Sequence, residues 1–242
     1  MKILYFDCPA GIAGDMTLAA LVDLGVDPRQ LEADLGSLSP DLPIRLEFKR
    51  VDKCGVSALK MELAEPFPQF HHHHYREVVG LIERAGLKDG ARQRALAIFE
   101  AIAVAEGAIH GLPIEAVHFH EVAAIDSIVD VIGVALAVEQ LQPERIVFSP
   151  LALGYGEVKC RHGVYPVPAL ATLEILKGLP VHSGHLPFEL TTPTGAAIAK
   201  TLAHAFEPGL PLMKVEKIGY GAGTRDLPER PNILRISLGE TL

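Results

Sequence analysis

The stretch KILYFDCPAGIAGDMTLAALVDLG (residues 2–25) decides the fold. Residues 2–7 predict a β-strand, and the proline and two glycines of segment 9–14 predict a turn. Residues 15–24 place apolar side chains at helical spacing, and Gly25 is typical of a helix end. A strand, a tight turn and a helix in immediate succession predict a sheet with helices packed on it.

Outward from this stretch, the sequence predicts further helices, strands and turns. We expect helices at residues 28–36, 75–86, 90–109, 121–141, 168–177 and 194–205. We expect strands at residues 44–51, 57–63, 146–149, 213–218 and 232–238. The first two of these strands should form a hairpin, and the last two should flank a glycine-rich loop. The predicted fold class is α+β, a mixed β-sheet packed by helices in a single domain over residues 1–242, with a helical cluster at about 75–141.

Composition excludes several classes of protein. The chain has 242 residues, of which 49% are hydrophobic, so it can bury a large core. Its 30 Asp+Glu outnumber its 22 Lys+Arg and give a net charge of −8, which argues against nucleic acid as a partner. Three cysteines without a C-x-x-C pair fit a reducing cytoplasm. The most apolar stretch, residues 122–138, is interrupted by Asp126 and Asp130, so we expect no membrane span.

Four consecutive histidines, His71 to His74, follow a proline-containing segment. Neutral imidazoles bind nickel, copper, zinc and cobalt, and a run on a loop can offer several nitrogens to one ion. Calcium and magnesium prefer oxygen ligands and would not select such a site. The histidine run therefore predicts a binding site for a metal of the nickel type. The alternative is a solvated loop with incidental metal affinity.

A second group of potential ligands comprises His118, His120 and Glu121, followed by Asp126 and Asp130. Two imidazoles and three carboxylates within thirteen residues are the inventory that a divalent metal site requires. The helix that carries the aspartates is apolar almost all round and should be buried, and a buried carboxylate needs a cation or several donors. Alternatively, Asp126 caps the helix and Asp130 interacts with the helix dipole in its first turn.

Two glycine-containing turns are candidate anion sites. In the first, Asp7, Gly11, Gly14 and Asp15 surround a strand-to-helix turn, which can direct backbone N–H groups and a helix N-terminus at an anion. The two aspartates could hold a metal on a ligand phosphate. The motif is neither G-x-G-x-x-G nor a Walker A sequence, and a plain turn is the alternative.

The second turn is TTPTG (191–195), in which Thr194 is the expected N-cap of the next helix. The hydroxyls of Thr192 and Thr194 suit a phosphate or carboxylate, and a simple cap is the alternative. The glycines of segment 219–223 would let a ligand approach the backbone. Cys8 is expected to be a small buried hydrophobic residue, with a soft metal ligand as the alternative.

Seven segments extend over nearly the whole chain: DCPAGIAGDM (7–16), HHHH (71–74), VHFHEVAAIDSIVD (117–130), HGVYPVPALAT (162–172), ELTTPTGAA (189–197), GYGAGT (219–224) and PNILRISLGE (231–240). In content and order they resemble the LarC family of nickel-insertion proteins, which act in the synthesis of the nickel-pincer cofactor.

This resemblance implies a lyase-class enzyme, a cyclometallase that inserts Ni²⁺ into pyridinium-3,5-bisthiocarboxylic acid mononucleotide and forms one Ni–C and two Ni–S bonds. It implies CTP with Mn²⁺ or Mg²⁺ as co-reactant, and a product that serves lactate racemase and related enzymes. Longer family members continue into a C-terminal domain that binds CTP. Because this chain stops at Leu242, we expect it to be the N-terminal part and to need a separate C-terminal domain as partner.

The resemblance also suggests a role for each candidate residue. The expected metal ligands are His71, His72, His73, His74, His118, His120 and Asp130. The expected catalytic residues are Glu121, Asp126 and His120. The expected residues on the phosphate and cofactor side are Asp7, Gly11, Gly14, Asp15, Thr192 and Thr194. A non-catalytic nickel metallochaperone or store and a CTP-independent mononucleotide-binding module are the rival functions, and a homo-oligomer is compatible with all of them.

Overall fold

The computed structural model describes residues 1–38, 44–64, 74–119, 125–160 and 163–242. Its helices are α1 (Gly14–Leu24), α2 (Pro28–Gly36), α3 (Tyr75–Arg84), α4 (Asp89–His110), the 3-10 helix η1 (Ile114–Ala116), α5 (Ile125–Leu141), α6 (Leu170–Ile175) and α7 (Pro193–Leu202). Its strands are β1 (Lys2–Asp7), β2 (Leu46–Lys53), β3 (Val56–Leu63), β4 (Arg145–Phe148), β5 (Leu151–Ala152), β6 (Gly156–Cys160), β7 (Gly163–Val167), β8 (Val181–His182), β9 (Ala205–Phe206), β10 (Met213–Ala222) and β11 (Ile233–Thr241).

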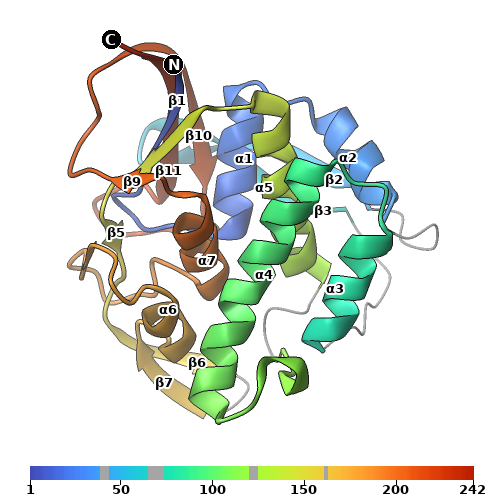
Figure 1. The fold of residues 1–242 in the computed structure, drawn as a ribbon. Helices are drawn as coiled ribbons and strands as arrows, with labels where there is room; N and C mark the ends of the chain where they lie inside the picture. Colours follow the sequence, from blue (N-terminus) through green and yellow to red (C-terminus); the bar gives the residue numbers. More distant parts are fainter. Residues whose placement is uncertain (39–43, 65–73, 120–124, 161–162) are drawn as a thin grey trace.

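Seven of these strands form one mixed sheet in the order β2-β3-β10-β11-β1-β4-β9 (Figure 1). The strand β1 pairs antiparallel with β11 and parallel with β4, and β2 and β3 form the predicted hairpin. Two small ladders, β5–β8 and β6–β7, lie outside this sheet. The predicted α+β class with a mixed sheet is therefore confirmed.

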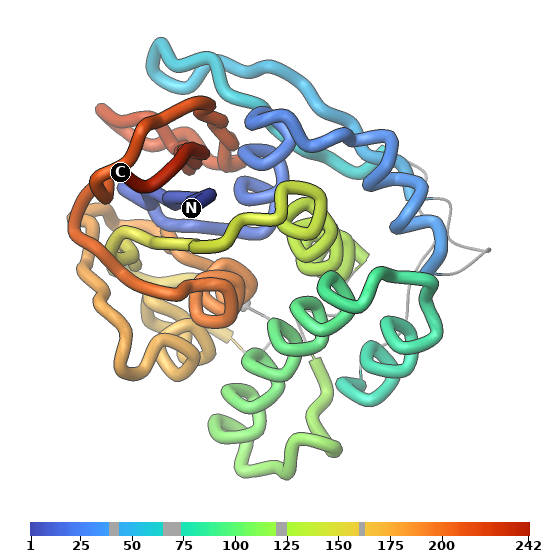
Figure 2. Tube along the Cα trace, turned by 45° about the horizontal axis from the view of Figure 1, so that its top comes forward, coloured from blue at the N-terminus to red at the C-terminus, as the bar shows by residue number. Residues whose placement is uncertain are grey.

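Helices pack on the sheet in successive layers (Figures 1 and 2). Helix α1 contacts β3, β10 and β11, α5 lies between α1 and α4, and α3 packs on α4. The apolar sequence of α5 is explained by this position, because side chains such as Ile128, Val131 and Ile132 are fully buried. The helical cluster predicted at about 75–141 is present in the described residues, although segment 121–124 of the expected helix 121–141 lies outside them.

The glycine-rich segment near the C-terminus is a strand, which corrects the predicted loop at 219–223. Gly219 and Gly221 belong to β10, directly beneath α1. A Cβ atom at Gly219 would lie 2.2 Å from the Ala20 carbonyl oxygen, and one at Gly221 would lie 1.9 Å from that of Met16. These glycines therefore let a helix approach a strand closely, and the expectation that they admit a ligand is wrong.

The start of α7 also differs from the prediction. The helix begins at Pro193, and the hydroxyl of Thr192 accepts a hydrogen bond from the backbone N–H of Gly195 at 3.2 Å. Proline is favoured at the first helical position because its missing N–H is not needed there. Thr192 is thus the N-cap, whereas Thr194, the expected cap, lies buried in the first turn.

Backbone hydrogen bonds join the two predicted anion-binding turns to each other. The N–H of Ile12 donates to the Leu190 carbonyl at 3.1 Å, and the N–H of Thr192 donates to the Ile12 carbonyl at 3.1 Å. Gly11 makes this approach possible, because a Cβ there would lie 2.1 Å from the Leu190 oxygen. Helices α1 and α7 consequently begin side by side.

Candidate functional site

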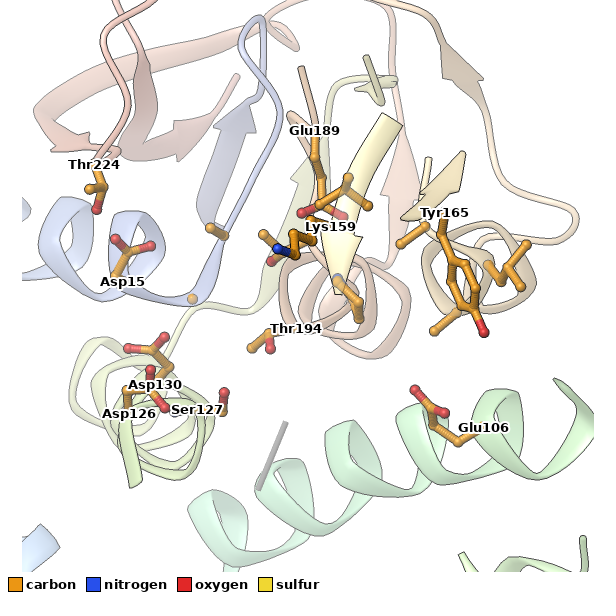
Figure 3. Close-up of a pocket in the computed structure, with 18 of the residues that line it drawn as sticks. Asp15, Glu106, Asp126, Ser127, Asp130, Lys159, Tyr165, Glu189, Thr194 and Thr224 are labelled. Atoms are coloured by element: carbon orange, nitrogen blue, oxygen red, sulfur yellow. Dashed lines mark hydrogen bonds between the residues drawn. The ribbon is translucent and has the colours of Figure 1, made fainter. Parts of the chain in front are cut away.

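A cavity of about 780 Å³ opens where α1, α5 and α7 begin (Figure 3). Its walls are completed by the end of β3, the hairpin β6–β7, the start of α6 and the C-terminal part of α4. Segments that are far apart in the sequence therefore meet in one place. Six candidates from the sequence line this pocket: Gly14, Asp15, Asp126, Asp130, Thr192 and Thr194.

Asp15, Asp126 and Asp130 form the acidic end of the pocket, and Figure 3 shows them on facing parts of α1 and α5. The Asp130 carboxylate accepts a hydrogen bond from the backbone N–H of Asp15. The residue before α1 is Ala13, and its side chain makes no capping hydrogen bond. Asp130 thus stabilises the start of α1 from a different helix. Gly14 permits this contact, because a Cβ there would lie 2.6 Å from the Asp130 Cβ.

Burial raises the pKa of the Asp130 carboxyl group well above its usual range, and the nearby charges of Asp15 and Asp126 raise it further. Burial also raises the pKa of Asp15, while backbone N–H groups and the charge of Lys60 oppose this effect. The Oδ1 atom of Asp130 is buried and has no hydrogen-bond partner among the described residues. These carboxyl groups can accept a proton or respond to an approaching cation.

Beside the acidic end, the pocket offers groups that suit an anion. The start of α7 supplies the positive end of its helix dipole and the Thr194 hydroxyl, and the side chains of Lys60 and Lys159 line the same cavity. Figure 3 places Thr194 and Lys159 between the acidic end and the wall formed by Tyr165 and Glu106. The pocket can therefore accommodate a small molecule that carries both signs of charge.

Several lining residues were missed by the sequence analysis: Lys60, Glu62, Glu106, His110, Ser127, Lys159, Tyr165, Glu189 and Thr224. Most of them occupy positions that resemble ordinary solvated faces of strands and helices. Glu106 and His110, for example, are an i, i+4 pair on α4, with 3.3 Å between His110 Nε2 and Glu106 Oε2. Such spacing is common on exposed helices and gives no signal of a pocket.

Other candidates lie elsewhere. Asp7 is not among the lining residues, and its Oδ2 accepts a hydrogen bond from Arg235 Nε at 3.0 Å. Gly11 packs against Leu190, and Cys8 is fully buried, as expected for a small hydrophobic residue. Five further candidates lie outside the described residues: His71, His72, His73, His120 and Glu121.

The remaining two histidine candidates, His74 and His118, lie together but do not line the pocket. Their ring centroids are 4.8 Å apart, and the ring planes are nearly perpendicular at 82°. In the part of the chain that the structure describes, no three His, Cys, Asp or Glu side chains meet in a potential metal-binding group. The potential ligands predicted from the sequence are thus divided between two places.

Fold and pocket define the chain as an α+β protein with an acidic ligand pocket at the start of three helices. Among the described residues, none of the helices combines the length and apolarity needed to cross a membrane. Comparison with known families makes the class specific, since the model of the nickel insertion protein family matches residues 4–242. The chain belongs to this family.

Several relatives carry the name pyridinium-3,5-bisthiocarboxylic acid mononucleotide nickel insertion protein. The one from Geobacillus kaustophilus is 51% identical over 249 residues, which cover 99% of this chain and 60% of the relative. One from Staphylococcus epidermidis is 45% identical over 235 residues, which cover 97% of this chain and 58% of the relative. The chain thus spans about 60% of the length of these relatives. No solved structure matches it.

Proposed function

We propose that this chain holds pyridinium-3,5-bisthiocarboxylic acid mononucleotide in its pocket while Ni²⁺ is inserted into the pyridinium ring. The observation that carries the proposal is the meeting of Asp15, Asp126 and Asp130 with the starts of α1 and α7 in a cavity of about 780 Å³. This volume is in the range of small-molecule sites. The names of the two relatives support the choice of substrate and metal.

The charges of the proposed substrate match the two ends of the pocket. A mononucleotide carries a phosphate, which the N-terminus of α7, the Thr194 hydroxyl and Lys159 would bind. A pyridinium ring and Ni²⁺ are cationic, and the acidic end would stabilise both. The ring would therefore lie toward Asp15 and Asp130, with the phosphate on the side of α7.

Formation of a Ni–C bond requires the ring carbon to lose a proton. The electron pair of the C–H bond passes to nickel, and the proton must go to a base. Asp130 suits this role because burial raises its pKa well above the usual range, which makes its carboxylate a stronger base. Thr192 and Thr194 would position the substrate, and Asp126 would add negative charge near the metal. The nickel–sulfur bonds form from the thiocarboxylates of the substrate without a further base.

The family resemblance further suggests that CTP with Mn²⁺ or Mg²⁺ takes part in the reaction, as in a lyase that supplies lactate racemase with its cofactor. The described residues contain no group of three potential ligands for such a metal. We therefore assign none of these residues to a metal–CTP complex. We expect turnover to require the region of the relatives that this chain does not span.

A mass-spectrometric turnover assay tests the proposal. The chain would be incubated with the mononucleotide, Ni²⁺, CTP and Mn²⁺, with and without a separately expressed C-terminal region of the Geobacillus relative. Nickelated product in either arm supports the proposal, and its dependence on the added region shows whether that region is needed. Asp130→Asn should remove the product, whereas Asp89→Asn, at a position with an 80% exposed side chain, is the matched control.

The rival function is that of a nickel carrier without catalysis, which the juxtaposed imidazoles of His74 and His118 favour. A carrier would bind nickel in the absence of the mononucleotide and yield no product in either arm of the assay. Nickel binding without turnover would therefore favour the carrier function over the insertase function.

A further inference from the structure

We infer that His74 and His118 form a two-imidazole site for a divalent ion of the nickel type, separate from the pocket. The inference rests on the proposed function only for the identity of the metal. The site itself follows from the backbone pairing, the ring geometry and the burial of the Nδ1 atoms of these two residues.

The backbone fixes the two rings side by side. His74 and His118 are paired in an antiparallel β-bridge, and the N–H of Tyr75 donates to the Val117 carbonyl at 3.2 Å. Directly opposed residues of an antiparallel pair project to the same side, with their Cβ atoms about 5 Å apart. The pairing therefore brings both imidazoles to one face.

Aromatic packing holds this bridge rigidly. The ring of Tyr75 lies 6.2 Å from that of Phe119, edge to face, and Phe119 lies 6.2 Å from Phe99 of α4. Phe99 is fully buried and Phe119 is 1% exposed. Residues that flank both histidines are thus anchored in the core, and a site held by a rigid scaffold needs little reorganisation to bind its ion.

His74 is the N-cap residue of α3 and takes part in a capping box with Glu77. Its backbone N–H donates to Glu77 Oε2 at 3.2 Å, which satisfies the start of α3 through the main chain. Its Nδ1 atom is buried and has no hydrogen-bond partner among the described residues. A buried polar atom without a partner is costly and calls for an ion or ordered water. Because the ring centroids of His74 and His118 are 4.8 Å apart, one metal ion can bind nitrogens of both rings.

Ligand chemistry restricts the ion. Imidazole nitrogen suits nickel, copper, zinc and cobalt, whereas magnesium and calcium require oxygen ligands. Two protein ligands leave further coordination positions open to water or to an acceptor. Such a site holds its ion exchangeably, which suits delivery better than storage.

The site adjoins the wall of the pocket without belonging to it. A Cβ at Gly107 of α4 would lie 3.4 Å from Val117 Cγ2, so the bridge packs against this turn of α4. Glu106 and His110 of the same part of α4 line the pocket. The bridge that carries the histidine pair therefore packs on the part of α4 that also contributes to the pocket wall.

Nickel titration of the full chain, without the mononucleotide, tests the site. The background variant replaces His71, His72 and His73 by alanine, so that His74 is the one histidine of the run that remains. We expect it to bind one Ni²⁺ per chain by calorimetry. Adding His74→Ala or His118→Ala should weaken binding at least tenfold. Adding His185→Asn, at an exposed position with φ of 58° where asparagine is tolerated, should leave binding unchanged.

A second measurement guards against loss of folding. X-ray absorption of the nickel-loaded background variant should show two imidazoles in the coordination shell, and circular dichroism should show the same helix content in all variants. Equal nickel affinity in the background and in both folded single variants would overturn the site, as would a shell without imidazole. Nickel binding by the pair in a chain that yields no product would contradict the proposed function alone, so the two failures are distinguishable.

Discussion

The acidic end of the pocket and the histidine pair are both built from side chains that bind metals, yet they differ in chemistry and support. Asp15 and Asp130 present oxygens at the start of two helices, and a hydrogen bond from a backbone N–H already engages one carboxylate. His74 and His118 present nitrogens from a β-bridge that is braced by aromatic rings. The carboxylates of the pocket are hard metal ligands that carry negative charge. The imidazoles of the pair are metal ligands of borderline softness.

This difference indicates a division of labour. Neutral imidazoles capture nickel selectively from a solution that contains magnesium and calcium. Carboxylates with raised pKa values are better suited to accept a proton and to stabilise a cationic ring. Substitutions should therefore separate nickel binding from product formation.

The largest effect is expected for Asp130→Asn, which keeps the shape of the side chain and removes its negative charge. We expect the rate of product formation to fall at least 100-fold, in the range typical for loss of a general base. Nickel affinity of the histidine pair should not change. Turnover by mass spectrometry and nickel titration by calorimetry measure the two quantities on the same preparation. A parallel loss of nickel affinity would contradict the division.

A smaller effect is expected for Gly14→Ala, which disturbs the acidic end without removing a charge. The new Cβ would lie 2.6 Å from both Cβ and Oδ2 of Asp130, so α5 must shift away from α1. We expect about a tenfold loss of turnover and a decrease of about 1–3 kcal/mol in the free energy of unfolding. Urea titration and the turnover assay measure these effects.

Gly36→Ala is the control for this substitution. Gly36 ends α2, and its added Cβ would meet no atom within 4 Å. It should leave turnover unchanged and alter stability by less than about 1 kcal/mol. Equal effects of the two substitutions would show that the close approach at Gly14 is unimportant.

Local patterns predicted most of the fold. The first strand, the turn after it and the start of α1 follow from residues 2–25, and the hairpin of β2 and β3 follows from alternation. The failure at Gly219 and Gly221 has a physical reason. Glycine is equally suited to a loop and to a strand under a closely packed helix, and only the position of α1 distinguishes the two.

The candidate site was predictable in its parts but not in its assembly. The sequence singles out Asp15 and Thr192 because they lie at glycine-containing turns that open helices, and Asp130 because it lies within an apolar helix. It does not reveal that α1 and α7 begin side by side, because two long-range hydrogen bonds of Ile12 create that arrangement. Lys159 also lines the pocket. The sequence does not predict this position, because a charged residue on a two-stranded hairpin is ordinarily solvated.

The buried carboxyl group also predicts a dependence of stability on pH. Its pKa is raised in the folded protein, so the folded state binds more protons than the unfolded state between about pH 4 and the raised value. Stability therefore falls as the pH rises through this window. Asp130→Asn removes this loss and should stabilise the protein by about 1–2 kcal/mol at pH 7–8, with no gain at pH 4.

Thermal unfolding followed by circular dichroism from pH 4 to pH 8 measures this effect. Asp89→Asn, on the exposed surface, is the control and should show no such dependence. A variant at position 130 that is less stable at pH 8 would mean that the negative charge is compensated in the folded protein. The acidic end of the pocket would then differ less from the histidine pair than the raised pKa of Asp130 indicates.

The smallest effect is expected for Lys159→Met, which tests the anion-binding side of the pocket. Lys159 is exposed, so its attraction to a phosphate is screened by solvent and contributes less than about 1 kcal/mol. We expect the KM for the mononucleotide to rise about threefold, with kcat unchanged and with a smaller effect at high salt. The histidine-pair variants should show the opposite pattern, because they change the nickel concentration needed for half-maximal turnover and leave this KM unaltered. A change in nickel dependence in Lys159→Met would show that nickel and phosphate share one end of the pocket, and the separation of the two regions would have to be abandoned.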